Sequence, residues 1–333
     1  MPAAQAYWVT RPGAGELRTE QLPVAPPPRT TRIRTEFSAV SSGTERLVGL
    51  GRVPAALESS MACVGMAGSF SLPVKYGYSL VGVAENGACA GRRVFAMHPH
   101  QDLADVGEEW VTPLTDGVPS ARAALIPNLE TALNATWDAE PMPAGEVAVF
   151  GAGAVGMLIA FALAREHGVR PTVVEPMAER RALAARLLDV TAAVAPDAVR
   201  PESFALAFHT TGQPRVLQAA LDAVGFEGRV IELSWYGDQR VELDLGGAFH
   251  ARRKQIWASQ VGAVAPRRRA THDRHARLRQ VQRLLADPAS AVLDGLLGQP
   301  APFDSLPVLM SEVYRGTAAA VVPLICYAAS SVS

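Results

Sequence analysis

The chain has 333 residues, 49% of them hydrophobic and 19% charged, with a formal net charge of −1. This length predicts about two domains, and the near-zero charge removes the electrostatic signature of a nucleic-acid or anionic-membrane partner. Cys63, Cys89 and Cys326 lie far apart, which excludes a disulfide scaffold and a CxxC-type metal site. Lys75 and Lys254 are the only lysines among 31 basic residues, a bias toward arginine that we interpret as compositional.

The N-terminal segment shows no apolar signal core and carries Arg11 and Glu16 early. The longest apolar stretch, 152–164, is shorter than the roughly 18–20 residues that span a bilayer. We therefore expect a cytoplasmic protein with no membrane partner.

The first part of the chain, up to about residue 122, is predicted to be rich in β-structure. Residues 29–40 alternate in the manner of a strand, and prolines within 23–28 mark the loop before it. Residues 80–87 and 91–98 are short β-type runs that end at Gly or Pro.

Beyond residue 122 the sequence alternates between strand-like and helix-like segments. The predicted strands are 146–150, 171–176, 204–212 and 229–237, and the predicted helices are 121–139, 154–168, 177–190 and 216–225. This alternation predicts a parallel sheet with right-handed crossovers. A basic helix at 267–288 and an apolar strand at 318–328 are expected to follow.

A G-x-G-x-x-G motif, GAGAVG, begins at Gly151, directly after a predicted strand, and opens a predicted helix. Gly151 permits a tight turn, Gly153 lets the backbone approach a pyrophosphate, and Gly156 lets the helix pack closely on the strand. The helix N-terminus then offers free N–H groups to phosphates. The predicted cofactor contacts in this loop are Gly151, Gly153, Ala154, Val155 and Gly156, although a ligand-free glycine-rich turn is the alternative.

Glu175 ends the next predicted strand, where a carboxylate accepts hydrogen bonds from the adenosine ribose and repels a 2′-phosphate. This favours NAD, with NADP as the alternative, because Arg180 and Arg181 follow closely. Those arginines can stack on adenine, bind a phosphate or simply be solvated. Thr211 and Gly212 end the strand that would reach the nicotinamide ribose, and they are further predicted cofactor contacts.

The chain has a β-rich part, then alternating strands and helices with the GAGAVG motif, then a short C-terminal segment. This order resembles that of the medium-chain dehydrogenase/reductase superfamily over essentially the whole chain. The resemblance implies an α/β fold with a GroES-like β-rich catalytic domain at 1–122 and a Rossmann doubly wound parallel-sheet domain at 123–265. It further implies that 266–333 returns to complete the catalytic domain, and that the protein forms a homodimer. The stretches that carry it are SSGTERL (41–47), KYGYSLVGV (75–83), GRRVF (91–95), residues 108–127 and GAGAVG (151–156).

Zinc-type alcohol dehydrogenases of this superfamily bind catalytic zinc through a Cys in a Cys-Gly-Thr-Asp-type motif and a His in Gly-His-Glu. This sequence places Ser42 and Tyr78 at those two positions, and a later ligand position falls near Pro127. Hydroxyls are poor zinc ligands beside thiolate and imidazole. The resemblance therefore implies a zinc-type relative with its ligands substituted, and we expect no zinc.

Hydride transfer to a carbonyl without zinc still requires a group that stabilises negative charge on oxygen. Tyr78 is the candidate general acid, Thr44 occupies the position of a relay hydroxyl, and Ser42 belongs to the same cluster. Lys75 can supply positive charge, and Glu130 can act as a base or pair with an arginine. The alternatives are a cleft-wall aromatic for Tyr78, turn hydrogen bonds for Ser42 and Thr44, and a solvated lysine for Lys75.

Histidines elsewhere in the chain are interpreted as structural. His98 and His100 follow a predicted strand, and a loop pair is favoured over a metal site because no third ligand is evident. His272 and His275 lie in the arginine-rich segment, which is typical of a solvated basic face or a subunit contact.

The sequence thus predicts a metal-independent NAD(P)-dependent oxidoreductase. The predicted reaction is hydride transfer between nicotinamide and a secondary alcohol or ketone of a small metabolite. One alternative is reduction of an activated C=C bond, and a second is a non-catalytic dinucleotide-binding protein.

Overall fold

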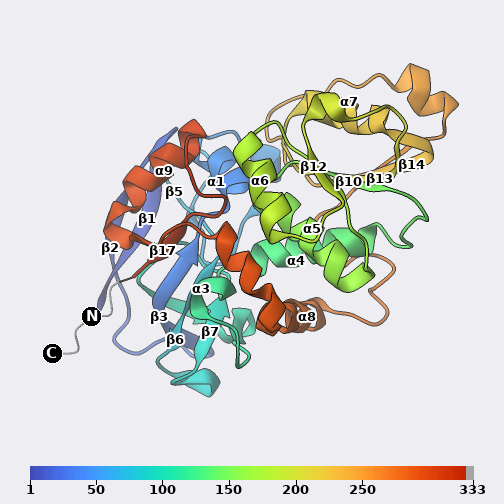
Figure 1. Cartoon of the computed structure of the whole chain (residues 1–333). Helices are drawn as coiled ribbons and strands as arrows, with labels where there is room; N and C mark the ends of the chain where they lie inside the picture. The colour runs from blue at the N-terminus through green and yellow to red at the C-terminus, as the bar shows by residue number, and fades with distance from the viewer. Residues whose placement is uncertain (328–333) are drawn as a thin grey trace. The chain divides into compact units, whose positions relative to one another are not determined.

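The computed structural model describes residues 1–327, so the last residue of the strand predicted at 318–328 lies outside it. The chain forms two compact units, which Figure 1 traces by residue number. A β-rich unit joins Met1–Pro127 to the segment from Gln282 onward, and a parallel-sheet unit is formed by Asn128–Val281. Residues 266–281 therefore belong to the parallel-sheet unit, whereas the sequence had assigned them to the C-terminal return.

The β-rich unit is built around β3 (Thr30–Ala39), the strand predicted at 29–40. β3 pairs antiparallel with β6, with β8 and with β17, so it lies in the middle of its sheet. That sheet runs in the order β16-β17-β3-β6-β7-β9, and a smaller sheet runs β2-β1-β5-β4. Besides β3, the strands of the unit that precede Pro127 are β1 (Ala3–Arg11), β2 (Ala14–Gln21), β4 (Ala67–Gly68), β5 (Val74–Lys75), β6 (Leu80–Ala84), β7 (Arg93–Ala96), β8 (Leu103–Gly107) and β9 (Val111–Pro113).

The C-terminal segment completes the β-rich unit, as the resemblance implied. β17 (Leu324–Cys326) pairs with β3 and is parallel to β16 (Ala301–Pro302). It is shorter than predicted because Pro323 precedes it and residues 319–321 form bends. The helix α9 (Leu306–Arg315) was not predicted, although its buried residues Leu306, Met310, Val313 and Tyr314 follow a helical period.

The short helices of the β-rich unit connect its strands. They are α1 (Ser42–Gly49), the 3₁₀ turn η1 (Ala55–Leu57), α2 (Glu58–Met61) and α3 (Ser120–Ala123). The sequence predicted one helix over 121–139. The structure has α3 and then α4 (Ile126–Asp138), with Pro127 in the first turn, where a missing N–H is tolerated.

The parallel-sheet unit has the strand order β12-β11-β10-β13-β14-β15, and every neighbouring pair is parallel. This is the order of the doubly wound Rossmann fold, with the first strand, β10, at the centre. The strands are β10 (Val147–Phe150), β11 (Thr172–Val174), β12 (Ala192–Val194), β13 (Phe204–His209), β14 (Val224–Glu232) and β15 (Gln255–Ala258).

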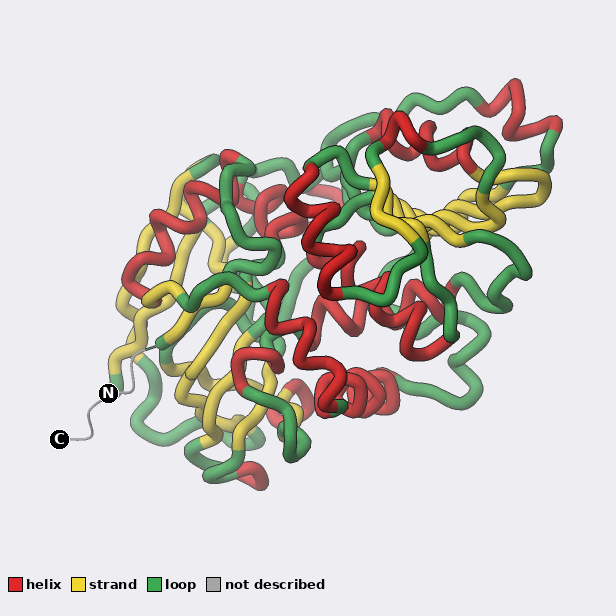
Figure 2. Tube along the Cα trace, in the orientation of Figure 1, coloured by secondary structure: helices red, strands yellow, loops and turns green. Residues whose placement is uncertain are grey.

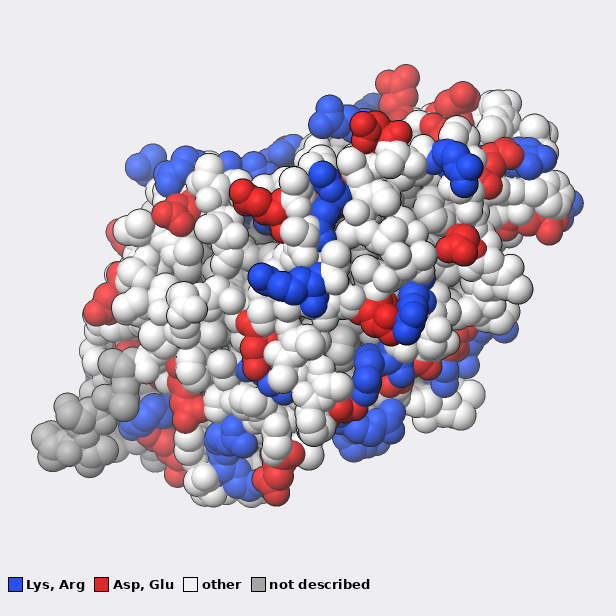
Figure 3. Space-filling view, viewed as in Figure 1, with Lys and Arg blue, Asp and Glu red and all other residues white. Residues whose placement is uncertain are grey.

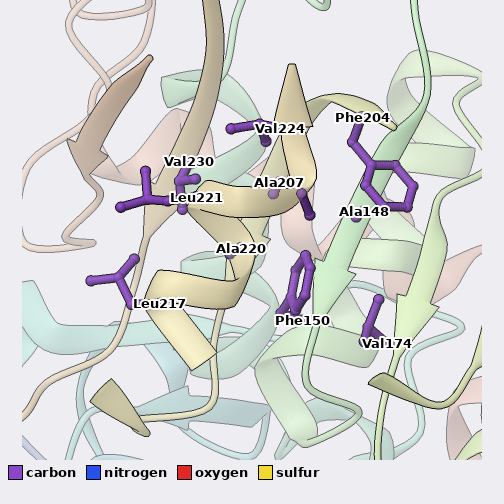
Figure 4. Packing of buried hydrophobic residues seen from close by; sticks show 11 residues of the cluster. Ala148, Phe150, Val174, Phe204, Ala207, Leu217, Ala220, Leu221, Val224 and Val230 are labelled. Atoms are coloured by element: carbon purple, nitrogen blue, oxygen red, sulfur yellow. The ribbon is translucent and has the colours of Figure 1, made fainter. Parts of the chain in front are cut away.

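Helices cover both faces of this sheet, which explains its apolar strands. α5 (Ala154–His167) and α6 (Ala178–Leu187) lie on one side of the strands, and α7 (Pro214–Ala223) lies on the other (Figures 1 and 2). Figure 4 shows Leu217 and Leu221 of α7 packed against the sheet, where Phe150 and Val230 belong to the same buried cluster.

The basic helix predicted at 267–288 begins later than expected. α8 (Arg274–Ala286) starts after Asp273, whose Oδ1 accepts a hydrogen bond of 2.7 Å from the backbone N–H of Ala276. This is an N-cap interaction, and it fixes the first turn of the helix. The arginines of 267–269 consequently lie in turns rather than in the helix.

Within residues 1–327 no helix is long and apolar enough to cross a membrane. On the face drawn in Figure 3, positive and negative side chains are interspersed, with no continuous basic surface.

Candidate active site

The GAGAVG loop connects β10 to α5 at the carboxyl edge of the parallel sheet. Gly151 has a φ of +108°, and a Cβ atom there would lie 2.8 Å from Thr210 Oγ1. A Cβ at Gly156 would lie 2.0 Å from the carbonyl oxygen of Gly151. Both positions therefore require glycine, for the turn and for the close approach of helix to strand, as the motif predicted.

The first turn of α5 has free N–H groups. Gly153 is the N-cap residue and provides no side-chain cap, and a Cβ placed on it would meet only Arg180 Nη1, at 4.0 Å. The backbone at Gly153, Ala154 and Val155 is thus open to an approaching phosphate, which the helix dipole would attract.

Glu175 follows β11 and is 7% exposed. Its Oε2 accepts a hydrogen bond of 2.9 Å from the N–H of Ala152, and its Oε1 accepts one of 3.0 Å from the N–H of Met177. The carboxylate is therefore held beside the glycine-rich loop. Each oxygen retains a lone pair that can accept a ribose hydroxyl.

The two arginines after Glu175 have different surroundings. Arg181 Nη1 donates to the carbonyl oxygens of Glu175 and Pro176, at 2.8 and 2.7 Å. Arg180 Nη1 makes a long contact, 3.4 Å, with the carbonyl oxygen of Ala152. Arg180 is consequently the arginine that lies over the glycine-rich loop.

Thr211 and Gly212 follow β13, beside the glycine-rich loop. Thr211 Oγ1 lies 2.7 Å from His209 Nε2, and the N–H of Gly212 donates to Ser234 Oγ at 3.0 Å. The predicted dinucleotide contacts of 151–156, Glu175, Arg180, Thr211 and Gly212 therefore share one edge of one sheet. A dinucleotide fits this edge by the general rule that ligands bind at the carboxyl ends of parallel strands.

In the β-rich unit the structure brings Tyr78 and Thr44 together. Thr44 lies in the first turn of α1, and Tyr78 lies in the loop between β5 and β6. The Tyr78 hydroxyl is hydrogen-bonded to the side chains of Thr44 and Ser41. Its ring stands edge-on to that of Tyr76, with centroids 6.1 Å apart.

Opposing effects act on the acidity of Tyr78. Burial and the negative charge of Glu45 raise the pKa of Tyr78 above its usual value, whereas the hydrogen bonds from Ser41 and Thr44 lower it. The net effect is a raised pKa for Tyr78, so the phenol keeps its proton at neutral pH. A proton donor needs this property, and Tyr78 can release the proton to an alkoxide, which is a stronger base than a phenolate.

A pocket of about 530 Å³ adjoins this cluster through Cys63. Cys63 Sγ donates to the carbonyl oxygen of Gly77 at 3.1 Å, and burial raises the pKa of the thiol to about 11. The thiol is therefore protonated and unreactive at neutral pH. The other residues that line the pocket are Ala55, Glu58, Ser59, Ala62, Met66 and Gly68.

Sequence reasoning missed a buried acid–histidine pair behind Tyr78. Glu45 Oε2 lies 2.9 Å from His100 Nε2, and Glu45 Oε1 accepts a hydrogen bond of 2.8 Å from the N–H of Ser41. His100 Nδ1 lies 2.7 Å from Ser38 Oγ. Glu45 thereby fixes the backbone of Ser41, whose side chain bonds to Tyr78. The only available signal was the acidic residue in the SSGTE motif, because nothing in the sequence associates it with His100.

His98, the other histidine of the predicted loop pair, is buried separately. Its Nδ1 lies 3.0 Å from the carbonyl oxygen of Pro99, and burial lowers the pKa of His98 to about 4. The imidazole is therefore neutral at neutral pH, and its ring is part of the protein interior.

The side chains at the positions that the resemblance assigned to zinc ligands are not ones that zinc prefers. Ser42 and Tyr78 offer hydroxyls and Pro127 offers no ligand, whereas zinc sites use thiolate, imidazole and carboxylate. Nowhere in residues 1–327 do three or more His, Cys, Asp or Glu side chains come together to hold a metal ion. Ser42 Oγ is instead buried without a hydrogen-bond partner in the described part of the chain.

Lys75 differs from its sequence-based interpretations, because it is neither solvated nor bonded to Tyr78. Its Nζ donates to Glu20 Oε2 at 2.7 Å and to Gln101 Oε1 at 2.9 Å, and the residue is 7% exposed. Lys75 therefore ties strand β5 to β2 through an ion pair. We no longer place it among the catalytic residues.

Glu130 adopts the second of its two predicted roles, pairing with an arginine. It lies 2.9 Å from Arg277 in an ion pair where both side chains are almost fully buried. Arg277 also donates to Asn134 Oδ1 at 2.6 Å and to the carbonyl oxygen of Val261 at 2.7 Å. The pair joins α4 to α8, so we withdraw Glu130 as a candidate base.

No family model matches the chain. Solved structures do resemble it along nearly its whole length. A proposed zinc-binding dehydrogenase from Sinorhizobium meliloti 1021, bound to NADP, is 17% identical with a TM-score of 0.76, covering 98% of this chain and 100% of that one. Benzyl alcohol dehydrogenase from Acinetobacter calcoaceticus gives the same identity, TM-score and coverage.

A further similar structure is an alcohol dehydrogenase from Escherichia coli CFT073 in complex with NADH. It is 15% identical with a TM-score of 0.75, and 98% of this chain covers 100% of it. At these identities the likeness establishes the fold. The chain therefore has the fold of the medium-chain dehydrogenases/reductases, a GroES-like β-rich unit together with a Rossmann dinucleotide-binding unit.

Proposed function

We propose that this protein is an NAD(P)-dependent oxidoreductase that interconverts a secondary alcohol and a ketone of a small metabolite. The observation that carries the proposal is the Tyr78 hydroxyl, bonded to Thr44 and Ser41 at a position where zinc-type relatives hold a metal ligand. The bound nicotinamide would supply or accept the hydride. The protein would supply the proton.

Tyr78 is proposed as the proton donor to the substrate oxygen. Its hydroxyl is held by two neighbouring hydroxyls, so it is oriented before a substrate arrives. A positioned donor of this kind contributes about 10²–10⁴-fold to a rate. Thr44 is proposed as the relay hydroxyl that returns a proton to Tyr78, and the pocket at Cys63 as the place for the substrate carbon skeleton.

We propose NAD as the preferred cofactor, with NADP as the alternative. The support is the carboxylate of Glu175, held by two backbone N–H groups beside the glycine-rich loop, where it would repel a 2′-phosphate. Arg180 would favour NADP instead, because its guanidinium lies over the same loop and can bind a phosphate.

We also propose that the reaction is independent of zinc, since hydroxyls replace the thiolate and imidazole ligands. The experiment is elemental analysis of the purified protein together with its activity in the presence of a chelator. About one tightly held zinc per chain would contradict metal independence.

A homodimer formed through the parallel sheets is the proposed assembly. β15 ends its sheet, and three of its four residues are exposed, including Trp257 at 48%. An uncovered edge strand with an exposed aromatic is a natural pairing surface. Light scattering of the wild type and of Trp257→Arg tests this, since the variant should shift the mass from dimer toward monomer.

The proposed reaction is tested with NADH and NADPH against panels of ketones and activated enones. Turnover of ketones is expected, and Tyr78→Phe should reduce kcat by at least about 10²-fold without changing the Kd of the dinucleotide. Tyr76→Phe is the matched control, because it removes a neighbouring hydroxyl that bonds to neither Thr44 nor Ser41. Preferential turnover of enones would favour the C=C alternative, and dinucleotide binding without turnover would favour a non-catalytic binder.

A further inference from the structure

A polar cluster lies at the carboxyl ends of β13 and β14, with His209 buried and its other members half-buried. His209 has no exposed surface, and its Nδ1 lies 2.7 Å from Glu232 Oε2. Glu232 also accepts hydrogen bonds from the Tyr236 hydroxyl at 3.2 Å and from the N–H of Ser234 at 2.6 Å. We call these four residues the His209–Glu232 cluster. No function considered above uses it.

The cluster lies next to the dinucleotide loop in the sheet. β13 pairs with β10, whose carboxyl end leads into that loop. Thr210, which follows His209, bonds through its N–H and its Oγ1 to the carbonyl oxygen of Phe150, both at 3.0 Å. Residues 209–211 are therefore fixed against the loop.

This position corresponds to the nicotinamide half of a bound dinucleotide, an assignment that rests on the proposed function. Glu175 at the end of β11 marks the adenosine side, and the pyrophosphate would lie at the N-terminus of α5. The remaining half must then extend over the ends of β13 and β14, on the other side of β10.

The hydrogen bonds indicate which charges the cluster carries. Thr211 Oγ1 accepts from the N–H of Gln213 at 3.1 Å, so its own hydrogen is free to donate to His209 Nε2, 2.7 Å away. With that donor on Nε2, His209 Nδ1 carries a ring proton and donates to Glu232 Oε2. The contacts of Glu232 in the described part of the chain include no lysine or arginine, so neither residue type compensates the charge of its carboxylate.

We propose that the carboxylate of Glu232 sets the preference of this site between the two redox states of nicotinamide. The oxidised ring carries a positive charge and the reduced ring is neutral. A fixed negative charge near the ring therefore stabilises the bound oxidised form and leaves the reduced form almost unaffected. His209, Tyr236 and Ser234 act as positioning residues, because their donors hold the carboxylate in one orientation.

The test is equilibrium titration of the whole protein with NAD⁺ and with NADH, for the wild type and for Glu232→Gln. The variant should weaken NAD⁺ binding by about tenfold, the order expected for removal of one partly buried charge, and change NADH binding by less than about twofold. Glu175→Gln is the matched control. The adenosine end is identical in both redox states, so this variant should change both Kd values by the same factor.

An unchanged ratio of the two Kd values in Glu232→Gln, with both dinucleotides still bound, would overturn the inference. If that variant does not fold, the two Kd values of the wild type provide the test. The wild type should bind NAD⁺ at least as tightly as NADH. A tenfold preference of the wild type for NADH would also overturn the inference. Failure of the wild type to bind either dinucleotide would instead contradict the proposed function.

Discussion

Glu45 Oε2 lies 2.9 Å from His100 Nε2, and the two side chains are 4% and 1% exposed although 55 residues separate them in the sequence. The pair joins α1 to the loop after β7. It also fixes Ser41, which bonds to Tyr78. Tyr78, the proposed proton donor, is thus supported through Ser41 by a buried acid and a histidine.

Replacing His100 by Ala should strongly destabilise the protein. Removing the imidazole leaves the buried carboxylate of Glu45 without one of its hydrogen-bond partners, which costs about 1–3 kcal/mol or more. The free energy of unfolding from urea titrations measures this. Glu85→Gln is the control, since Glu85 pairs with Arg34 on the surface and exposed pairs contribute about 0–1 kcal/mol. Equal losses of unfolding free energy in the two variants would show that the Glu45–His100 pair stabilises the protein no more than an exposed pair does.

The buried histidine His98 should make stability depend on pH. Burial lowers its pKa in the folded state to about 4, whereas an unfolded histidine titrates near ~6.5. Below pH ~6.5 the unfolded state therefore binds a proton that the folded state does not. Stability that is fully present above that pH is lost as the pH falls toward about 4, by about 2 kcal/mol at pH 5.

Urea unfolding at pH 7 and pH 5 tests this for the wild type and for His98→Gln. The variant should lose less stability over that interval, because its side chain does not titrate. An identical loss in both proteins would assign the acid sensitivity to groups other than His98. Asp102 is not such a group, because burial raises its pKa and the folded state therefore gains stability from it as the pH falls.

The elements that sequence reasoning predicted well are those specified by neighbouring residues. GAGAVG encodes its turn locally, and Gly151 and Gly156 occupy the strained and the crowded positions that the motif predicts. The likeness to zinc-type relatives brought Tyr78 and Thr44 to attention, and the structure places the two in contact. Their catalytic roles stay predictions.

Side-chain pairing across the fold was much less predictable. Lys75 bonds to Glu20, 55 residues away, and Glu130 to Arg277, 147 residues away. Tertiary packing determines which residues form such pairs, and it produces no periodic pattern in the sequence. The helix α9 is different, because its apolar period was readable and we missed it.

Glu130→Gln should lower stability while leaving the chemical step unchanged. The substitution removes the charge that compensates Arg277 in the packing of α4 and α8, so a loss of about 3 kcal/mol is expected. Unfolding and kcat are both measured, with Glu227→Gln, whose pair with Arg253 is exposed, as the control. A fall in kcat comparable to that of Tyr78→Phe would restore Glu130 as a catalytic candidate.

Glu175→Gln should reduce the difference in affinity between NAD and NADP. The amide keeps an oxygen that can accept from a backbone N–H, but it removes the charge that repels a 2′-phosphate at the end of β11. The ratio of the Kd values for NADP⁺ and NAD⁺ should fall by about tenfold, the order expected for one charge at a partly buried site. Titration of Glu179→Gln, an exposed acid of α6 close by in the sequence, measures the effect of net charge alone. If the ratio in Glu175→Gln stays at the wild-type value, Glu175 does not determine cofactor preference, and Arg180→Ala would then show whether the arginine over the loop does.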